Sequence, residues 1–307
     1  MAEIIELKDH LKGKGKHPEP PRSGAELVRG LKEAYTLFSP LTNLPYAECE
    51  QENFNDQSFL YETKEAVEAA AAAYEEQGVR VSVRELKTVE LQIPVQADKP
   101  DGEKRRVYLN QVRQHLGILP FMGLNAVRFQ PAAGAACLID LEELLPEDFQ
   151  KKVNANELYQ PTLQLTGAYL MQEARRKKEF VDMKHLKELD EEFSSNLVKS
   201  RLFLAVLPPE GKEKEPKLNL SECKLPYLKH QNGDLFFPVF TDIWEFQKYA
   251  QSRKGVRSIQ IPFTQLLKFE GKEAKSYMLN PMGFSLPLTR EMIPKLLQKF
   301  GASVEPT

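Results

Sequence analysis

Three landmarks in the second half of the chain decide the fold: Leu225-Pro226-Tyr227, Phe240-Thr241-Asp242 and Leu279-Asn280-Pro281-Met282-Gly283-Phe284. A degraded copy occurs earlier, as Leu44-Pro45-Tyr46, Tyr61-Glu62-Thr63 and Leu124-Asn125-Ala126-Val127-Arg128-Phe129. Because the order and the approximate spacing agree, we predict one small fold used twice, with a groove between the copies. The first copy is longer before its third landmark. We place the extra residues in a surface hairpin between Lys87 and Gly117, which turns at Asp98-Lys99-Pro100-Asp101-Gly102.

The composition is that of a globular protein with room for two domains. The chain has 307 residues, 41% hydrophobic and 28% charged. A formal net charge of -2 gives no general affinity for nucleic acid or a membrane surface. The sequence contains no apolar run of the roughly 20 residues that span a bilayer, and Met1 to Lys12 lacks the apolar stretch of a secretion signal. Cys49, Cys137 and Cys223 occupy unrelated places in the two copies, so we expect reduced thiols and a cytoplasmic location.

Local signals in the first copy predict a helix, a strand and a second helix. An apolar face of helical spacing runs from Gly24 to Phe38 and ends at Ser39-Pro40. The strand Phe59 to Tyr61 leads into Thr63, which we interpret as the N-cap of a helix that Gly78 terminates.

The second copy repeats this order. Leu235 to Phe240 is a strand, in which Pro238 favours an edge position or a bulge. Asp242 and Glu245 form a capping box that opens the next helix. A closing helix lies within Thr289 to Phe300, and two helices and the strand Arg201 to Leu207 precede the copy.

These elements predict an α+β protein made of two tandem small domains, each a mixed sheet flanked by helices. The predicted organisation is a mobile leader at residues 1–23, a first domain at 24–152 and a second domain at 153–307.

The sequence holds no motif of a known catalytic or cofactor site. Nucleophile-elbow, dinucleotide-binding, Cys-x-x-Cys and His-Glu-x-x-His patterns are all absent from it. The histidines are His10, His17, His115, His185 and His230. None has a partner at a spacing typical of metal ligands, so we expect no metal and no cofactor.

One constellation supports two interpretations. We expect six aromatic and polar residues of the second copy to converge where its strand, capped helix and Asn280 loop meet: Phe240, Asp242, Trp244, Tyr277, Asn280 and Phe284. They form either a binding pocket with Asp242 and Asn280 as its polar groups, or a core in which Asp242 caps a helix and Asn280 holds a turn. The position of Trp244 directly after the cap keeps the pocket interpretation open.

The second copy resembles the SseB N-terminal domain of the bacterial enhanced-serine-sensitivity proteins. The resemblance covers about Leu225 to Leu297 and rests on the Phe-Thr-Asp motif, the aromatic helix after it and the Asn-Pro-x-Gly loop. It implies a small, cytoplasmic α+β domain of bacterial origin with no established catalytic residues. The first copy departs from the pattern and is interpreted as a divergent second example.

We therefore expect a non-enzymatic, cytosolic binding or adaptor protein. It resembles SseB-type proteins, which are linked to serine sensitivity. The alternative is a small-molecule sensor or enzyme in amino-acid metabolism that uses a pocket near Trp244 and Asn280. The expected partner is a protein or a small metabolite, with no nucleic acid and no membrane. The sequence assigns no oligomeric state, and self-association of the copies is a third hypothesis.

Overall fold

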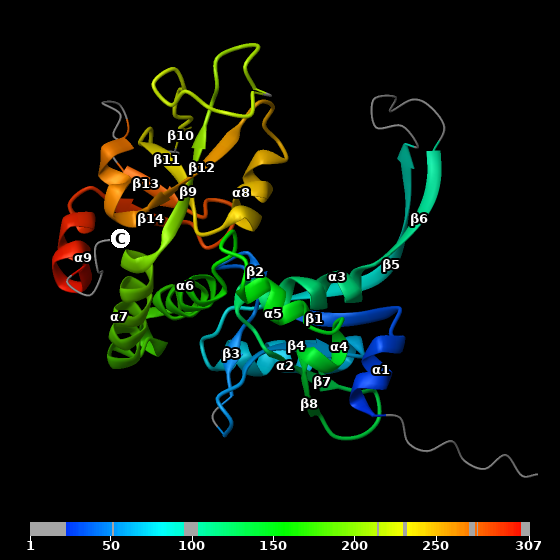
Figure 1. Ribbon diagram of the computed structural model, residues 1–307. Helices are drawn as coiled ribbons and strands as arrows, with labels where there is room; N and C mark the ends of the chain where they lie inside the picture. The colour runs from blue at the N-terminus through cyan, green and yellow to red at the C-terminus, as the bar shows by residue number, and fades with distance from the viewer. Residues whose placement is uncertain are drawn as a thin grey trace, which may run out of the picture.

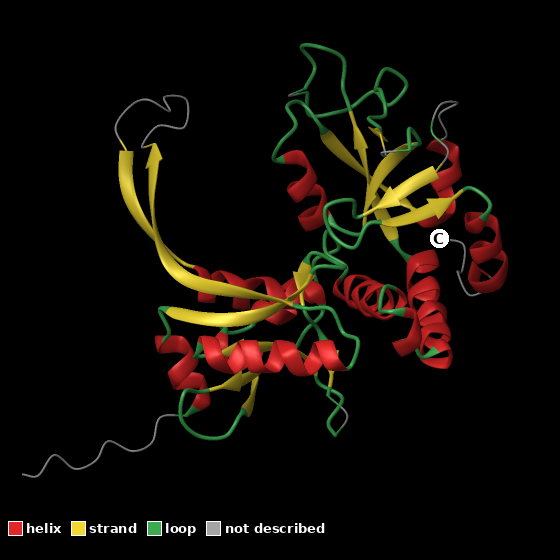
Figure 2. Ribbon diagram, turned by 180° about the vertical axis from the view of Figure 1, so that it is seen from behind, coloured by secondary structure: helices red, strands yellow, loops and turns green. Residues whose placement is uncertain are grey.

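The computed structural model describes residues 23–50, 52–94, 104–213, 215–229, 232–269, 274 and 276–301. The predicted leader, apart from Ser23, and the predicted turn at Asp98 to Gly102 lie outside the described residues. The chain forms two mixed sheets with helices packed around each, which confirms the α+β class (Figures 1 and 2). We call residues 23–154 the N-terminal unit and residues 161–301 the C-terminal unit.

The N-terminal unit contains a sheet of strand order β6-β5-β1-β4-β7-β8, with β2 paired to β1 and β3 paired to β4. The strands are β1 (Glu33–Ser39), β2 (Leu44–Pro45), β3 (Glu48–Cys49), β4 (Asp56–Tyr61), β5 (Ser82–Pro94), β6 (Lys104–Asn110), β7 (Ala126–Gln130) and β8 (Cys137–Asp140). The helices are α1 (Gly24–Gly30), α2 (Lys64–Glu76), α3 (Gln111–Ile118), η1 (Leu119–Met122), α4 (Leu141–Leu144) and α5 (Phe149–Asn154). The predicted domain boundary at Val153 falls inside α5.

The C-terminal unit contains a sheet of order β12-β9-β11-β13-β14, with β10 paired to β11. The strands are β9 (Arg201–Val206), β10 (Leu228–Lys229), β11 (Leu235–Phe240), β12 (Arg257–Pro262), β13 (Ser276–Leu279) and β14 (Leu286–Thr289). The helices are α6 (Pro161–Ala174), η2 (Lys178–Phe180), α7 (Met183–Lys199), α8 (Ile243–Ala250), η3 (Phe263–Phe269) and α9 (Met292–Phe300).

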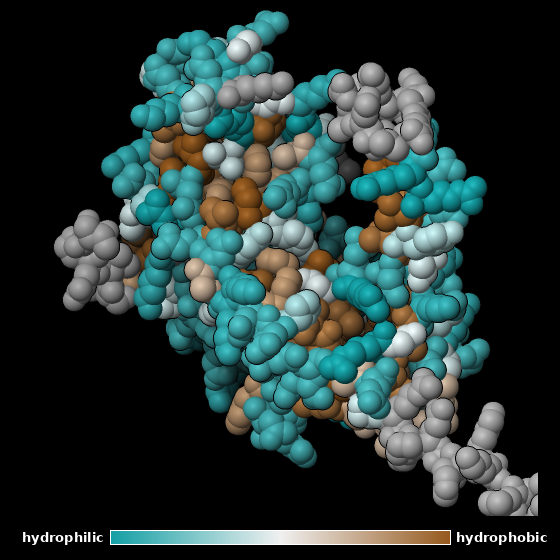
Figure 3. Space-filling view, turned by 45° about the vertical axis from the view of Figure 1, so that its right-hand side comes forward, coloured by the Kyte–Doolittle hydropathy of each residue, from teal (hydrophilic) through white to brown (hydrophobic). Residues whose placement is uncertain are grey.

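A run of five strands in one sheet has the same order and the same directions as a run of five strands in the other. The run β5-β1-β4-β7-β8 corresponds to β12-β9-β11-β13-β14. In the first run the pair β4–β7 is parallel, in the second the pair β11–β13 is parallel, and the other described ladders are antiparallel. The N-terminal unit adds β6 and the outer half of β5, which project as a two-stranded hairpin (Figures 1 and 3). The prediction of a hairpin after Lys87 is confirmed.

One landmark pairing predicted from the sequence is wrong. Asn125 precedes β7, whereas Asn280 follows β13, so the two asparagines lie at opposite ends of corresponding strands. The last residue of β4, Tyr61, lies opposite Gln130 in the parallel ladder. The parallel ladder of β11 and β13 ends at the pair Val239 and Leu279. Asn280 is the next residue after that pair, as Phe240 is on β11. Gln130 is therefore the counterpart of Asn280, and a proline follows both.

The helix predicted from Gly24 to Phe38 is also wrong in its second half. It ends at Gly30, and Glu33–Ser39 forms the interior strand β1. Leu37 packs in a cluster with α2, while Thr36 on the opposite face lies against His115 of α3. A strand covered on both faces lacks polar alternation, so its apolar run resembles the face of a helix.

Pro238 lies in an interior strand and not at a sheet edge. On its antiparallel side, β11 pairs with β10 through Leu235 and Phe236, and with β9 through Val239 and Phe240. Pro238 lies between these two ladders and is paired with neither β10 nor β9. Its missing N–H therefore costs no ladder hydrogen bond on that side.

Helix α6 lies between the two units and joins their cores (Figure 1). Its buried residues lie around most of its circumference, as expected for a helix covered from several sides. On one side it packs with η1 of the N-terminal unit, and on another with α7. A Cβ at Gly167 would lie 2.8 Å from the ring of Phe284, so this glycine permits the close approach of the turn after β13 to α6.

Candidate functional site

The Phe-Thr-Asp and Asn-Pro-x-Gly motifs meet in one buried hydrogen-bond network. Asn280 Oδ1 accepts from the backbone N–H of Thr241 (2.9 Å), and Asn280 Nδ2 donates to Gln164 Oε1 of α6 (2.9 Å). Asp242 Oδ1 accepts from the backbone N–H of Glu245 (2.9 Å), which confirms the predicted N-cap of α8. Because all of these side chains are buried, each hydrogen bond satisfies a group that water does not reach.

Glu245 does not complete the predicted capping box. Its Oε1 instead accepts from Gln164 Nε2 and from Lys248 Nζ, both at 2.6 Å. The same carboxylate lies against Gly283, where a Cβ would come 2.9 Å from Oε2. The glycine of the Asn-Pro-x-Gly motif is thus required by the packing of the turn on the start of α8.

The six predicted binding residues do not gather around a cavity. Phe240 packs with Phe246 and Tyr249 in a cluster on one face of the sheet. Tyr277 and Phe284 belong to the main core on the other face. A single pocket therefore cannot be lined by all of them.

The polar members of the set are sealed as well. Asp242 and Asn280 are 1% and 0% exposed. Trp244 is half-buried against the main core, and Lys248 Nζ lies 4.1 Å from its ring centroid. The arrangement is that of a core with capping and turn residues, and the expectation of a pocket at this place is corrected.

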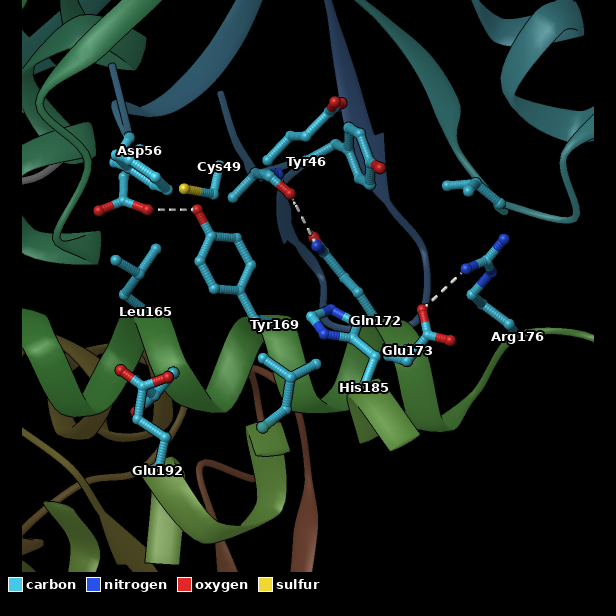
Figure 4. A pocket seen from close by; sticks show the side chains of 16 residues that line it. Tyr46, Cys49, Asp56, Leu165, Tyr169, Gln172, Glu173, Arg176, His185 and Glu192 are labelled. Atoms are coloured by element: carbon cyan, nitrogen blue, oxygen red, sulfur yellow. Dashed lines mark hydrogen bonds and ion pairs between the residues drawn. The ribbon is translucent and has the colours of Figure 1, made fainter. Parts of the chain in front are cut away.

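A cavity of about 500 Å³ lies instead between the two units (Figure 4). We call it the interdomain pocket. Its lining residues are Tyr46, Ala47, Glu48, Cys49, Phe54, Asp56 and Val79 of the N-terminal unit, and Leu165, Thr166, Tyr169, Gln172, Glu173, Arg176, His185, Leu189 and Glu192 of α6, α7 and the loop between them. A groove between the two units is therefore present, and none of its lining residues was predicted as a site residue.

Two contacts from α6 hold the walls of the interdomain pocket together (Figure 4). Tyr169 donates its hydroxyl hydrogen to Asp56 Oδ1 at 2.7 Å. Gln172 Nε2 donates to the carbonyl of Ala47 (2.9 Å), and Gln172 Oε1 accepts from the N–H of the same residue (3.3 Å). One helix thereby fixes the position of β3 and of the start of β4.

An ion pair lies at the opposite end of the interdomain pocket. Arg176 pairs with Glu173 at 2.8 Å, and both side chains are largely buried. Arg176 also donates to the carbonyl of Gln77 (2.6 Å), while Glu173 accepts from the N–H of Asp182 (3.0 Å). The two charges therefore neutralise each other and are bound to both units.

The end of the pocket near Asp56 is electronegative. Burial raises the pKa of Asp56, and the hydrogen bond from Tyr169 opposes that shift. Burial, followed by the charge of Asp56, raises the pKa of both Cys49 and Tyr169. Cys49 is thus held as a thiol and not as a reactive thiolate. Cys49, Cys137 and Cys223 are all free, as predicted.

The structure gives no alternative centre for metal chemistry within its described residues, where no three His, Cys, Asp or Glu side chains gather. His115 is buried beside Thr36, and burial lowers its pKa to about 4. His10, His17 and His230 lie outside the described residues. In the described part of the chain, every helix is too short or too polar to cross a bilayer.

Comparison with known proteins places one family match on the C-terminal unit. Residues 182–295, a little over a third of the chain, match the family described as SseB protein N-terminal domain. The match includes α7, the Phe-Thr-Asp and Asn-Pro-x-Gly motifs and the start of α9. It leaves out α6 and the whole N-terminal unit. Among curated proteins, no match was found.

Two solved structures also align with the chain. Tic22 from Anabaena, described as a protein transport structure, is 7% identical with a TM-score of 0.19, and the alignment covers 93% of this chain and 100% of that one. Tic22 from Plasmodium falciparum is 9% identical with a TM-score of 0.17, and the alignment covers 91% of this chain and 98% of that one. Such scores do not establish a shared fold.

Proposed function

We propose that this protein is a non-enzymatic binding or adaptor protein, and that its ligand site is the interdomain pocket. The observation that carries the proposal is the construction of this pocket from both units. Its volume of about 500 Å³ lies in the range of ligand sites. Its walls combine apolar side chains with a small number of polar groups fixed by hydrogen bonds.

The rim of the pocket supplies a second argument. Phe54, at the tip of the hairpin between β3 and β4, is 74% exposed and has a φ of 56°. An aromatic residue in the left-handed region is uncommon and costs conformational energy. An exposed ring held in this way at the mouth of a cavity is suited to contact a ligand.

The SseB match supports a C-terminal unit of this type, and the shared strand order supports a divergent copy in the N-terminal unit. On this basis we propose that the protein is bacterial and cytoplasmic, and that it is connected with serine sensitivity. The alternative function, a small-molecule sensor, is supported by the volume of the same pocket and no longer by Trp244 and Asn280.

A photo-cross-linking residue at position 54 tests the binding function in extract of the source cells. We expect a defined adduct that Glu192→Trp abolishes, because an indole on this exposed position of α7 would fill the pocket. Glu188→Trp, one helical turn earlier, is the matched control, and a cross-linker at exposed Tyr227 controls for nonspecific capture. Adducts that both tryptophan variants retain would remove the interdomain pocket as the binding site.

A further inference from the structure

We infer that the interdomain pocket accepts an organic cation with a short apolar stem, such as the ammonium group of a lysine side chain or of a free alkylamine. The inference rests on the proposed function, since it names the chemistry of the ligand in the same pocket. It follows from the charges, the walls and the hydrogen bonds of the pocket.

The charged groups that line the pocket do not balance. Glu173 and Arg176 neutralise each other at one end. The carboxylates of Glu48, Asp56 and Glu192 remain. Among the described lining residues, Arg176 is the only arginine or lysine and His185 is the only histidine. These three carboxylates would attract a cation into the part of the pocket near Asp56 and would repel an anion from it.

The carboxylates of Asp56 and Glu48 are already oriented by tyrosines. Tyr169 donates to Asp56 Oδ1 at 2.7 Å, and Tyr74 donates to Glu48 Oε2 at 2.6 Å. Each of these bonds engages one oxygen, whereas an ionised carboxylate offers about four acceptor positions on two oxygens. The carboxylates can therefore accept further hydrogen bonds from an ammonium group while they stay fixed in place.

The walls between the charged groups fit an apolar stem. Tyr46 and Leu165 line opposite sides of the pocket, and the ring of Tyr169 lies between Asp56 and the floor formed by α6 (Figure 4). Aromatic faces also attract cations. A ligand with an ammonium head and a chain of a few methylene groups satisfies both kinds of surface.

The state of Asp56 agrees with this choice of ligand. Burial raises its pKa, although the hydrogen bond from Tyr169 opposes the shift, so the ionised form is less favoured than it would be in water. An entering ammonium group would favour the ionised form again. Binding should therefore weaken as the pH falls and Asp56 becomes protonated. The other titratable groups on the described walls of the pocket are Tyr46, Glu48, Cys49, Tyr169, Glu173, Arg176, His185 and Glu192.

The test uses the full chain and two-dimensional NMR of its backbone amides, with n-butylammonium as the probe. 1-Butanol and butyrate are the neutral and anionic controls of similar size. We expect saturable shifts at Cys49 and Tyr169, with an affinity for n-butylammonium at least ~10-fold above that for either control. Asp56→Asn and Glu192→Gln should each weaken binding several-fold. Glu191→Gln, a neighbouring position on α7 that pairs with Lys299, should leave it unchanged.

A lysine tripeptide with blocked ends identifies the source of the ammonium group. Tighter binding of the tripeptide than of n-butylammonium supports a polypeptide ligand, and weaker binding supports a free amine. The inference is overturned if 1-butanol or butyrate binds as well as n-butylammonium, or if none of the probes gives saturable shifts. Pocket-dependent adducts at position 54 in that case would preserve the proposed binding function and exclude only the cationic ligand. Glu192 is exposed, so its variants also report when Asp56→Asn is poorly folded.

Discussion

Asn280 and Thr241, 39 residues apart, are joined by a hydrogen bond of 2.9 Å from the backbone N–H of Thr241 to Asn280 Oδ1. This bond connects the end of β13 to the residue before the N-cap of α8. Asn280 adopts a φ of 48°, which asparagine tolerates better than most residues. The two motifs of the SseB match are therefore a single structural device that holds a turn against a helix.

Asn280→Ala should lower the free energy of unfolding by about 2 kcal/mol, because it leaves the N–H of Thr241 and the amide of Gln164 buried without this partner. Urea denaturation measures the loss. Asn125→Ala is the matched control, since Asn125 is half-buried and donates one side-chain bond, to Asn55. The control should lose less than about 1 kcal/mol. Equal losses would contradict the different roles that we assign to the two asparagines.

Gly283→Ala should destabilise the protein by about 1–3 kcal/mol, because the new methyl group meets the buried carboxylate of Glu245. In the double variant with Glu245→Ala, the effect of the methyl group should become smaller than in the wild type. Gly30→Ala is the control, since no atom lies within 4 Å of the added Cβ and α1 ends there. Thermal unfolding is measured for the wild type, both single variants, the double variant and the control, and additive effects would exclude the contact as the cause.

Elements with strong local signals were predicted from the sequence. The N-caps Thr63 and Asp242 each accept a hydrogen bond from a backbone N–H three residues later, and the strands β4, β9 and β11 lie where the pattern indicated. These signals depend on neighbouring residues and need no knowledge of the fold. β1 was missed because helices cover both of its faces.

Features that depend on contacts between distant parts of the chain could not be predicted from local sequence patterns. The counterpart of Asn280 is Gln130, and only the parallel ladder reveals the correspondence. The interdomain pocket joins β3, β4 and two helices more than a hundred residues later, through contacts such as Tyr169 to Asp56. Its tyrosines and carboxylates are ordinary residues in local context, so no spacing in the sequence marks them as a site.

The stability of the C-terminal unit should depend on the ionisation of Asp242. Burial, and then the charge of Glu245, raises the pKa of Asp242 to about 7. This is above the value of about 3.9 expected in the unfolded chain. The folded state therefore binds the proton more tightly, so this group makes the protein less stable as the pH rises from about 4 to about 7, with no further change outside that window.

Asp242→Asn should abolish this pH dependence, since asparagine also serves as an N-cap but does not ionise. The urea midpoints of the wild type and the variant are compared at several values between pH 4 and pH 8. We expect the variant to gain relative to the wild type as the pH increases. A constant difference across the range would show that Asp242 does not titrate in this window.

Tyr169→Phe should weaken the connection between the two units. It removes the hydroxyl that donates to Asp56, and a bond to a charged group contributes about 1.5–3 kcal/mol. Since the same bond lowers the pKa of Asp56 against the effect of burial, its removal should raise that pKa further. The loss of stability should therefore be largest at neutral pH and shrink as Asp56 is protonated. Tyr35→Phe is the control, because its hydroxyl donates to Glu33 on the exposed surface and its loss should change stability little. A double-mutant cycle with Asp56→Ala measures the coupling, and a coupling near zero would show that the contact does not join the units.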